Sequence, residues 1–409
     1  MAVFICSFIS RIINYYQPTA IKQTDLGEIA LPLSRPAAAV IETPTSKILD
    51  SDEKKLSNRI QAVADERLPV SFSSGRVNEC SQAVDEPKEI RVQIAQSMVA
   101  TIQRIAGDSM RRLDPANKDS AALKTGVYYP IDYLKALERT GNSKRLTWLV
   151  QKNVSYHCFV SPNHFNTVSA PAPAISIQFV LKPGVPAHEA LEALLTGPSL
   201  IGCGEVCALS IYESLKNAWG IEKFDILFSG DSPTPLTVKF DDRWHPLKCF
   251  IKLAELPAQR GDIIRFSNTP EYGTIHPLGI ASNYNTICCD PMIPSFTTLG
   301  LPSEGLTIDG MNQKLFLDCI SEDDSFKFLT PEFTAEFRRH CPSLWARSQL
   351  AAKLPPEYRM TQKRFKEFGG GAMERITLDT ERIIQIQQME IKVARALLTS
   401  WNTTQSGLK

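Results

Sequence analysis

The chain has 409 residues, which is enough for two or three domains of ordinary size. Its 45 lysine and arginine residues nearly balance 44 aspartate and glutamate residues, so the formal charge is +1. This balance excludes the electrostatic footprint of a protein that wraps nucleic acid, and no nucleic-acid partner is expected. A hydrophobic fraction of 43% excludes a wholly disordered chain.

The chain carries 10 cysteines, which are too sparse in a protein of this length to form a disulfide scaffold. We therefore expect reduced thiols and a cytoplasmic protein. No apolar run reaches the roughly 18 residues that span a bilayer, so no integral membrane segment is expected.

Residues 1–88 are expected to be a mostly disordered N-terminal segment, because the stretch after residue 17 is rich in proline, serine, threonine, alanine and aspartate. The apolar start has neither a preceding basic residue nor a small-residue cleavage site, which argues against a secretory signal. We interpret it as a loosely docked chain end rather than a membrane anchor.

Regular patterns begin at Ile90, where apolar residues recur at helical spacing as far as Ile105. A second helix is expected over 131–139, and the alternation over 146–160 is typical of a strand. We assign residues 89–170 to a helical or mixed subdomain.

Residues 171–320 are expected to form the main folded domain. The pattern predicts a buried strand over 175–181, a helix over 188–195, a helix beginning near Cys203, and short strands near 250, 263–266, 275–281 and 286–289.

Residues 321–409 are assigned to a C-terminal helical extension. In it, a glycine joint at 369–371 precedes a long amphipathic helix at 377–401, which we expect to pack on its own domain rather than on a partner. The order of elements indicates an α+β fold rather than regular βαβ units.

Cys203 stands between Gly202 and Gly204 at the expected start of a helix. Unpaired N–H groups and the positive end of the helix dipole favour a thiolate at that position. Cys207 lies one turn later on the apolar stripe of the same helix and is interpreted as a core residue. The chain contains no phosphate-binding loop, no HExxH zinc helix and no GxSxG elbow.

His276 is the candidate general base, because it opens an apolar stretch that we interpret as a strand followed by a turn at 282–285. The returning strand would end near Asp290 and lie beside His276. A carboxylate there would hold the imidazole in one tautomer and stabilise its charged form. Asp290 is therefore the predicted orienting residue, with Asn285 in reserve.

A zinc site built from Cys203, Cys207, His276 and the adjacent pair Cys288 and Cys289 is an alternative use of these residues. Adjacent cysteines have poor spacing for chelation, so no metal and no cofactor are expected.

Several short motifs follow one another between residues 175 and 318: a cysteine that opens a helix, Glu-Lys-Phe at 222–224, Gly-Asp at 261–262, and Leu-Gly-Leu-Pro-Ser-Glu-Gly-Leu at 299–306. Their order resembles the papain-like NlpC/P60 superfamily of cysteine enzymes, and within it the bacterial, sporulation-type protein-glutamine gamma-glutamyltransferases. The resemblance implies a helix packed on a short antiparallel sheet, with Cys203 in the nucleophile's place. The chain differs at Gly202, where that family has a glutamate, and at Thr298-Leu299-Gly300, where the family has Gly-His-Gly.

These residues predict a cysteine-dependent acyl transfer. Cys203 would attack a glutamine side chain or a peptide amide, His276 would move the proton, and the backbone N–H groups of Cys203 and Gly204 would form the oxyanion hole. The expected partners are a protein or peptide substrate and a primary-amine co-substrate.

Two other functions remain open: a thiol protease or amidase, and a non-catalytic partner-binding protein built on a papain-like shell. The long polar front segment leads to a further hypothesis, that the protein is exported as a bacterial effector into a host cell.

Overall fold

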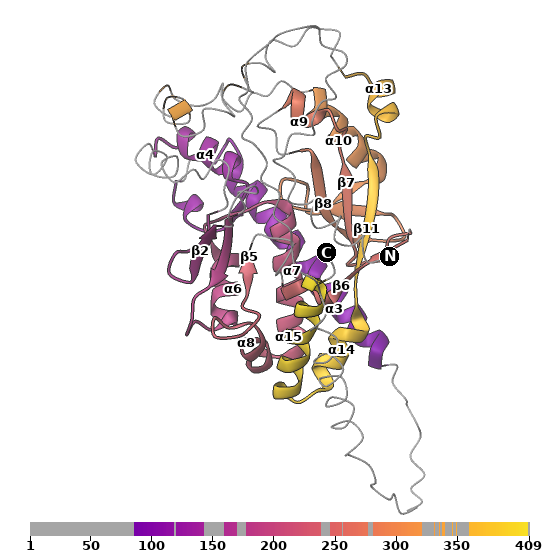
Figure 1. The fold of residues 1–409 in the computed structure, drawn as a ribbon. Helices are drawn as coiled ribbons and strands as arrows, with labels where there is room; N and C mark the ends of the chain where they lie inside the picture. The colour runs from indigo at the N-terminus through magenta and orange to yellow at the C-terminus, as the bar shows by residue number, and fades with distance from the viewer. Residues whose placement is uncertain are drawn as a thin grey trace, which may run out of the picture. The chain divides into compact units, whose positions relative to one another are not determined.

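The computed structural model describes residues 86–117, 120–142, 159–169, 177–238, 246–255, 257–276, 281–320 and 360–407, with a few single positions between 331 and 349. The N-terminal segment expected to be disordered and most of the strand predicted at 146–160 lie outside these residues. All the described residues belong to one compact unit of the chain. They form an α+β fold of mixed helices and antiparallel sheet (Figure 1).

Two long helices pack against each other at the centre of this unit. Helix α3 (Glu86–Leu113) confirms the periodicity that begins at Ile90, and its apolar positions Ile94, Met98 and Ile102 are all buried. Its partner, α7 (Cys203–Trp219), begins at the predicted cysteine. Burial of these apolar stripes is the main reason that both segments are helical, because propensity alone rarely holds an isolated helix in water.

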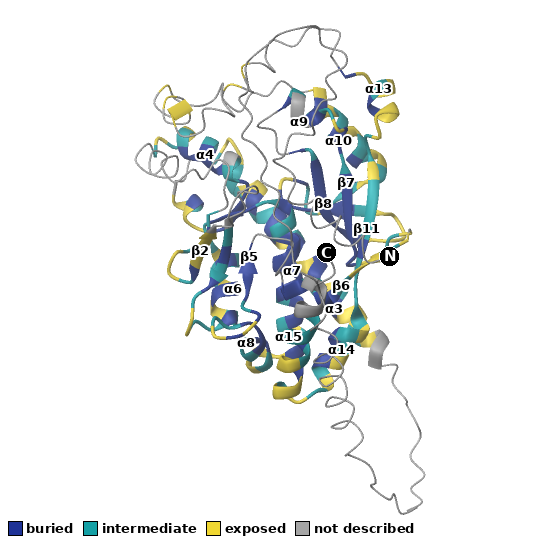
Figure 2. Ribbon diagram, viewed as in Figure 1, coloured by how far each residue is buried: buried dark blue, intermediate teal, exposed yellow. Residues whose placement is uncertain are grey.

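One sheet supplies the second layer. Its six strands are antiparallel and follow the order β10-β9-β8-β7-β11-β6. Their bounds are β6 (Ile251–Ala254), β7 (Ile263–Ser267), β8 (Asn283–Asp290), β9 (Ser295–Thr297), β10 (Leu306–Thr307) and β11 (Ala372–Leu378). Figure 2 shows that β7 and β8 are buried almost throughout.

The two faces of this sheet carry different cores, because successive side chains on a strand point to opposite faces. Ile287 and Cys289 of β8 pack with α3 and α7 in one core. Tyr284 and Cys288 of the same strand pack in the other core with helix α10 (Ile308–Ile320), through residues such as Leu315. Asn283 and Asn285 share the face of Ile287, toward α7.

Smaller elements complete the unit. Strands β2 (Phe165–Ser169), β3 (Ile177–Leu181) and β5 (Thr237–Val238) form a three-stranded antiparallel sheet. Helices α6 (Ala187–Thr196) and α8 (Ile221–Phe228) pack on each other, and α6 also packs on α7. Two short 3-10 helices lie at Ser120–Lys124 and Pro246–Phe250.

A pair of two-residue strands joins the segment before helix α4 (Pro130–Arg139) to the segment before α7. Strand β1 (Val127–Tyr128) runs parallel to β4 (Ser199–Leu200). Gly197 makes their approach possible, because a Cβ at this residue would lie 1.9 Å from the carbonyl oxygen of Gly126.

The C-terminal region corrects one expectation. Residues 372–378 form β11 between β7 and β6, and are not part of a helical extension (Figure 1). Helices α13 (Gln362–Glu367), α14 (Thr380–Gln388) and α15 (Ile391–Gly407) flank it, so the predicted long helix at 377–401 is wrong at its start and interrupted at Met389. Asp379 sets the helix start, because its side chain accepts a hydrogen bond from the N–H of Arg382.

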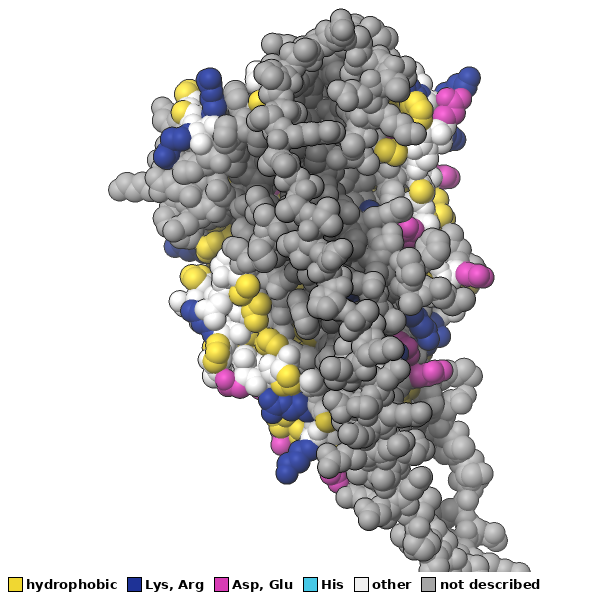
Figure 3. All heavy atoms as spheres, viewed as in Figure 1, with side chains coloured by type: hydrophobic (Ala, Val, Ile, Leu, Met, Phe, Trp, Pro, Cys, Tyr) yellow, Lys and Arg dark blue, Asp and Glu magenta, His cyan; other side chains and the backbone are white. Residues whose placement is uncertain are grey.

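The described surface agrees with the near-neutral charge. On the face drawn in Figure 3, basic and acidic side chains are interspersed. In the described part of the chain, no helix combines the length and the apolar character needed to cross a bilayer.

Candidate active site

The start of helix α7 is built by local hydrogen bonds around Gly202. The N–H of Gly202 donates to Oε2 of Glu205 at 3.0 Å, and the N–H of Val206 donates to the carbonyl of Gly202. A Cβ at residue 202 would lie 2.7 Å from that carboxylate oxygen, so a glycine leaves the space that Glu205 fills. This cap places Cys203 at the first helical position, as predicted.

The Cys203 thiol faces strand β8. Two groups of Asn285 donate to its Sγ, the backbone N–H at 3.4 Å and Nδ2 at 3.6 Å. The thiol itself is 4.0 Å from the carbonyl oxygen of Asn283. Asn285 was the alternative prediction for the residue that orients His276. In the structure it contacts the candidate nucleophile instead.

The side chain of Tyr129 also lies near enough to the thiol to lower its pKa. The parallel pairing of β1 with β4 places it there, since the N–H of Ile201 donates to the carbonyl of Tyr128 at 3.0 Å, next in the chain to Tyr129. The ring of Tyr129 lies over Gly300, where a Cβ would come within 2.9 Å of Cε2. Segments far apart in the sequence thus meet at one thiol.

The electrostatic state of the thiol differs from the expectation. Burial raises the pKa of Cys203 above its usual range, because the site disfavours the charged form. The hydrogen bonds from Asn285 and the nearby side chain of Tyr129 work in the opposite direction, while the carboxylate of Glu205 raises the pKa further. Burial thus opposes the effect of the helix start on the pKa of Cys203 and favours the neutral thiol.

His276 lies elsewhere in the fold. It follows the short helix α9 (Tyr272–Ile275), and residues 277–280 lie outside the described part of the chain. The neighbours of β8 are β7 on one side and β9 on the other, and not a strand from His276, so the predicted hairpin is wrong. The His276 Nε2 is hydrogen-bonded to the carbonyl oxygen of Cys319 at 2.8 Å, and its ring packs on Tyr272 with centroids 5.0 Å apart.

These contacts place the imidazole in the core on the α10 side of the sheet. Cys203 belongs to the core on the α7 side. The periodicity could not reveal this, because a short apolar stretch before a turn fits a helix end as well as a strand.

Asp290 is also distant from the thiol. It ends β8, is exposed, and accepts hydrogen bonds from the N–H groups of Met292 and Ile293. It follows Asn285 by five residues along an extended strand, which corresponds to about 17 Å. The structure therefore brings Cys203 together with Asn285, and not with His276 or Asp290.

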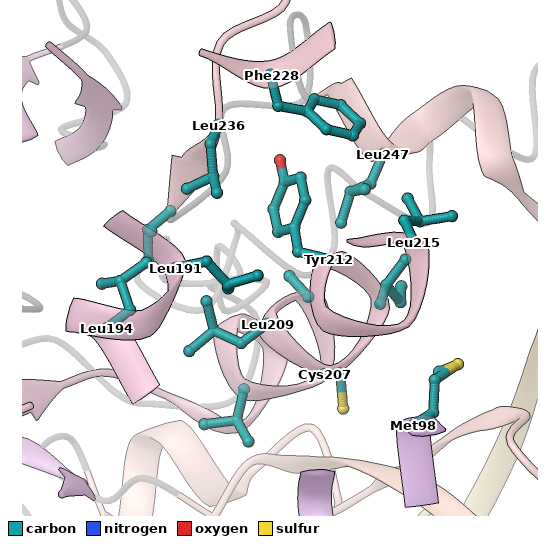
Figure 4. Close-up of a cluster of buried hydrophobic side chains, with 14 of the residues drawn as sticks. Met98, Leu191, Leu194, Cys207, Leu209, Tyr212, Leu215, Phe228, Leu236 and Leu247 are labelled. Atoms are coloured by element: carbon teal, nitrogen blue, oxygen red, sulfur yellow. The ribbon is translucent and has the colours of Figure 1, made fainter. Parts of the chain in front are cut away.

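The other cysteines in the described part of the chain are buried and behave as core residues. Figure 4 shows Cys207 among apolar side chains that include Met98, and its thiol donates to the carbonyl of Asn285 at 3.4 Å, in agreement with the interpretation from sequence. Cys288 and Cys289 point to opposite cores. Among the residues that the structure describes, no three histidine, cysteine or acidic side chains gather to hold a metal ion.

Two further histidines fall in the described part of the chain, and both have partners away from Cys203. His188 binds Asp225 through Nδ1 at 2.6 Å, and His164 contacts Ser161 at 3.1 Å.

The site residue that sequence reasoning missed is Tyr129. Its position before Pro130 is the usual signal for a helix start, but nothing local connects it to Cys203.

Comparison with known proteins adds little to this geometry. The chain matches no family model and no curated protein. Among solved structures it is similar to a transglutaminase from Geobacillus stearothermophilus without its C-terminal extension, with 11% identity and a TM-score of 0.38, over 75% of this chain and 99% of that one. This similarity is too low to establish an activity, so the function has to come from the chemistry of the site itself.

Proposed function

We propose that the protein catalyses a cysteine-dependent acyl transfer from a carboxamide, with Cys203 as the nucleophile. The observation that supports this most directly is the convergence of two hydrogen bonds from Asn285 on a sulfur at the first residue of a helix. A helix start and hydrogen bonds donated to the sulfur both favour the thiolate form, which is the attacking species.

The groups around Cys203 are suited to each part of the acyl-transfer step. The sulfur attacks the carbonyl carbon of a glutamine side chain or another amide, and negative charge develops on the carbonyl oxygen. The N–H groups at the start of α7, including those of Cys203 and Gly204, are suited to hold that oxygen, and Nδ2 of Asn285 supplies a further donor.

The low exposure of the thiol supports transfer to an amine rather than to water. Cys203 exposes 9% of its surface in the structure, so a bound substrate leaves little room for solvent at the sulfur. Water exclusion of this kind protects an acyl-enzyme from hydrolysis. The preferred reaction is therefore transamidation of glutamine, with deamidation as its hydrolytic side reaction.

A direct test is incubation of the full-length protein with a glutamine-rich protein and a biotinylated primary amine. Incorporation should be lost in Cys203→Ala and kept in Cys207→Ala, a matched control because both thiols lie on α7 and contact Asn285. His276→Gln and Asp290→Asn should keep the activity, since neither side chain contacts the sulfur in the structure.

Other outcomes point to the other functions. Cleavage or deamidation that depends on Cys203, without amine incorporation, would mean a hydrolase. If no Cys203-dependent product forms from any amide substrate, and iodoacetamide labels Cys203 no faster than Cys207, the acyl-transfer proposal fails and a partner-binding role takes its place.

A further inference from the structure

We propose that Asn283 is a positioning residue, which holds the carboxamide of Asn285 with its NH2 group toward the Cys203 sulfur. The inference rests on the acyl transfer proposed above and concerns the same thiol. Nδ2 of Asn285 donates to the sulfur at 3.6 Å and to Oδ1 of Asn283 at 3.3 Å. The two hydrogens of one amide group are thus divided between the thiol and the neighbouring asparagine.

Strand β8 brings the two asparagines together. They are two residues apart on an extended strand, so both side chains lie on the face toward α7. Pairing with β7 fixes their backbone, since Ser267 lies opposite Asn283 and Arg265 lies opposite Asn285. The two asparagines are only 6% and 5% exposed, so their amide groups depend on protein partners for their hydrogen bonds.

The orientation of the Asn285 amide decides which group faces the sulfur. An NH2 group donates to a thiolate and stabilises it, whereas an amide oxygen would accept a hydrogen bond from the neutral thiol and stabilise that form instead. A half-turn of the amide would exchange its nitrogen and oxygen with little change of shape. The site therefore needs a neighbour that distinguishes the two orientations.

Asn283 makes this distinction with its own amide oxygen. In the reversed orientation, two oxygens would face each other across the 3.3 Å that now separates Nδ2 of Asn285 from Oδ1 of Asn283, and neither has a hydrogen to donate. Asn283 is itself oriented, because its Nδ2 donates to the hydroxyl of Ser282 at 3.4 Å. One chain of hydrogen bonds therefore runs from Ser282 through both asparagines to the thiol.

A fixed donor is useful at this thiol because its surroundings oppose the charged form. Burial raises the pKa of Cys203, and the hydrogen bonds donated by Asn285 lower it. The same NH2 group is suited to the carbonyl oxygen of a bound amide as negative charge develops there. A donor that packing has set before the substrate binds costs no reorganisation during the reaction.

The test compares Asn283→Leu with Thr286→Val. Leucine has a shape similar to asparagine but no acceptor, so the Asn285 amide is free to reverse. The pH midpoint of iodoacetamide labelling at Cys203 should then rise by about one unit. Asn283→Ala, which also lacks an acceptor and adds no bulk, should shift the midpoint in the same direction.

Thr286→Val is the matched control for this substitution. Thr286 is a fully buried residue of the same strand, and its hydroxyl donates to the carbonyl of Ile264 at 2.8 Å. It lies on the opposite face of β8 from the two asparagines, because side chains alternate along a strand. Its loss of a buried hydrogen bond should leave the labelling midpoint of Cys203 unchanged.

A double substitution separates positioning from a general structural effect. In an Asn285→Leu background the amide is gone, so Asn283→Leu should add no further rise in the labelling midpoint. The double variant replaces both polar partners by apolar groups of similar shape, a change that is often nearly neutral for stability. Equal midpoint shifts in the two backgrounds would refute the claim that Asn283 acts through Asn285.

The rate of amine incorporation separates failure of this inference from failure of the proposed function. Asn283→Leu should lower that rate about tenfold, because the resting thiol would hold the reversed amide by a hydrogen bond that has to break. A wild-type protein that transfers no acyl group, but shows the midpoint shift and its loss in the Asn285→Leu background, would refute the proposed function and keep the positioning role. An active wild type whose labelling midpoint moves by less than about 0.2 units in Asn283→Leu would refute the positioning role alone.

Discussion

The C-terminal strand β11 is joined to the sheet by a buried ion pair, and breaking that pair should destabilise the whole unit. Nε of Arg375 lies 2.6 Å from Oδ2 of Asp262, and the two side chains are only 9% and 4% exposed. The same carboxylate oxygen accepts a hydrogen bond from the N–H of Gln259 at 2.5 Å. Asp262 belongs to the Gly-Asp motif, so this motif has a structural role here.

The size of the loss in unfolding free energy depends on the charge that remains after the substitution. In Asp262→Ala the buried guanidinium of Arg375 keeps a hydrogen bond to the carbonyl of Glu255 but loses its counter-ion. Removing one partner of a buried pair costs about 3–5 kcal/mol, because the remaining charge stays desolvated and uncompensated. We expect the free energy of unfolding of Asp262→Ala to fall by that amount.

Urea unfolding followed by tryptophan fluorescence measures this change, since Trp219 is buried in the core that contains Cys203. The exposed pair Lys363–Glu367, 3.8 Å apart with 86% and 58% of its side chains exposed, is the matched control. Lys363→Met should cost no more than about 0.5 kcal/mol.

The double variant Asp262→Ala with Arg375→Met should lose less than the sum of the single losses, because it removes both charges together. A cost below about 1 kcal/mol for Asp262→Ala would refute the claim that β11 is held by a desolvated charge pair.

Three further outcomes are expected. Burial raises the pKa of Cys289 to about 11 from a usual value of 9.0. As the pH rises, this thiol therefore ionises first in the unfolded chain, so the stability that is present below about pH 9 is lost toward about pH 11. Urea unfolding at about pH 8 and about pH 10.5 should show this loss, and Cys289→Ala should reduce it. Lys223→Met removes the ammonium that donates to three carbonyls at the end of α14, and an unfolding free energy unchanged from wild type would contradict the expected loss of about 1–3 kcal/mol. Gly197→Ala should separate β1 from β4, cost about 2–4 kcal/mol and change the labelling rate of the site thiol, whereas Gly141→Ala, with a similar φ of +69° and nothing within 4 Å of its Cβ, should cost about 1 kcal/mol. Equal costs for the two alanine variants would show that the close approach is unimportant.

Much of the local structure could be predicted from sequence. Helical periodicity identified α3 and the start of α7, and the apolar stripe correctly assigned Cys207 to the core. The strand at β3 and the helix at α6 also emerged from pattern. These predictions succeed because hydrogen bonds within a helix and side-chain alternation along a strand depend on residues only a few positions apart.

Predictions that needed long-range pairing failed. Residues 377–378, predicted as the start of an amphipathic helix, are the end of β11, because their pairing with β6 decides that they are a strand. The predicted hairpin of His276 with Asp290 does not form, because β7 and β9 occupy the two edges of β8.

The sequence alone determined that Cys203 begins a helix and that its thiol is the one to test. Which side chains reach that thiol was decided only by the tertiary structure. The alternation of β8 turns Asn285 toward α7 and Tyr284 toward α10, and the β1–β4 pairing places Tyr129 near the thiol. Strand register and the choice of partner strands depend on burial of whole faces against other elements, and no window of neighbouring residues contains that information.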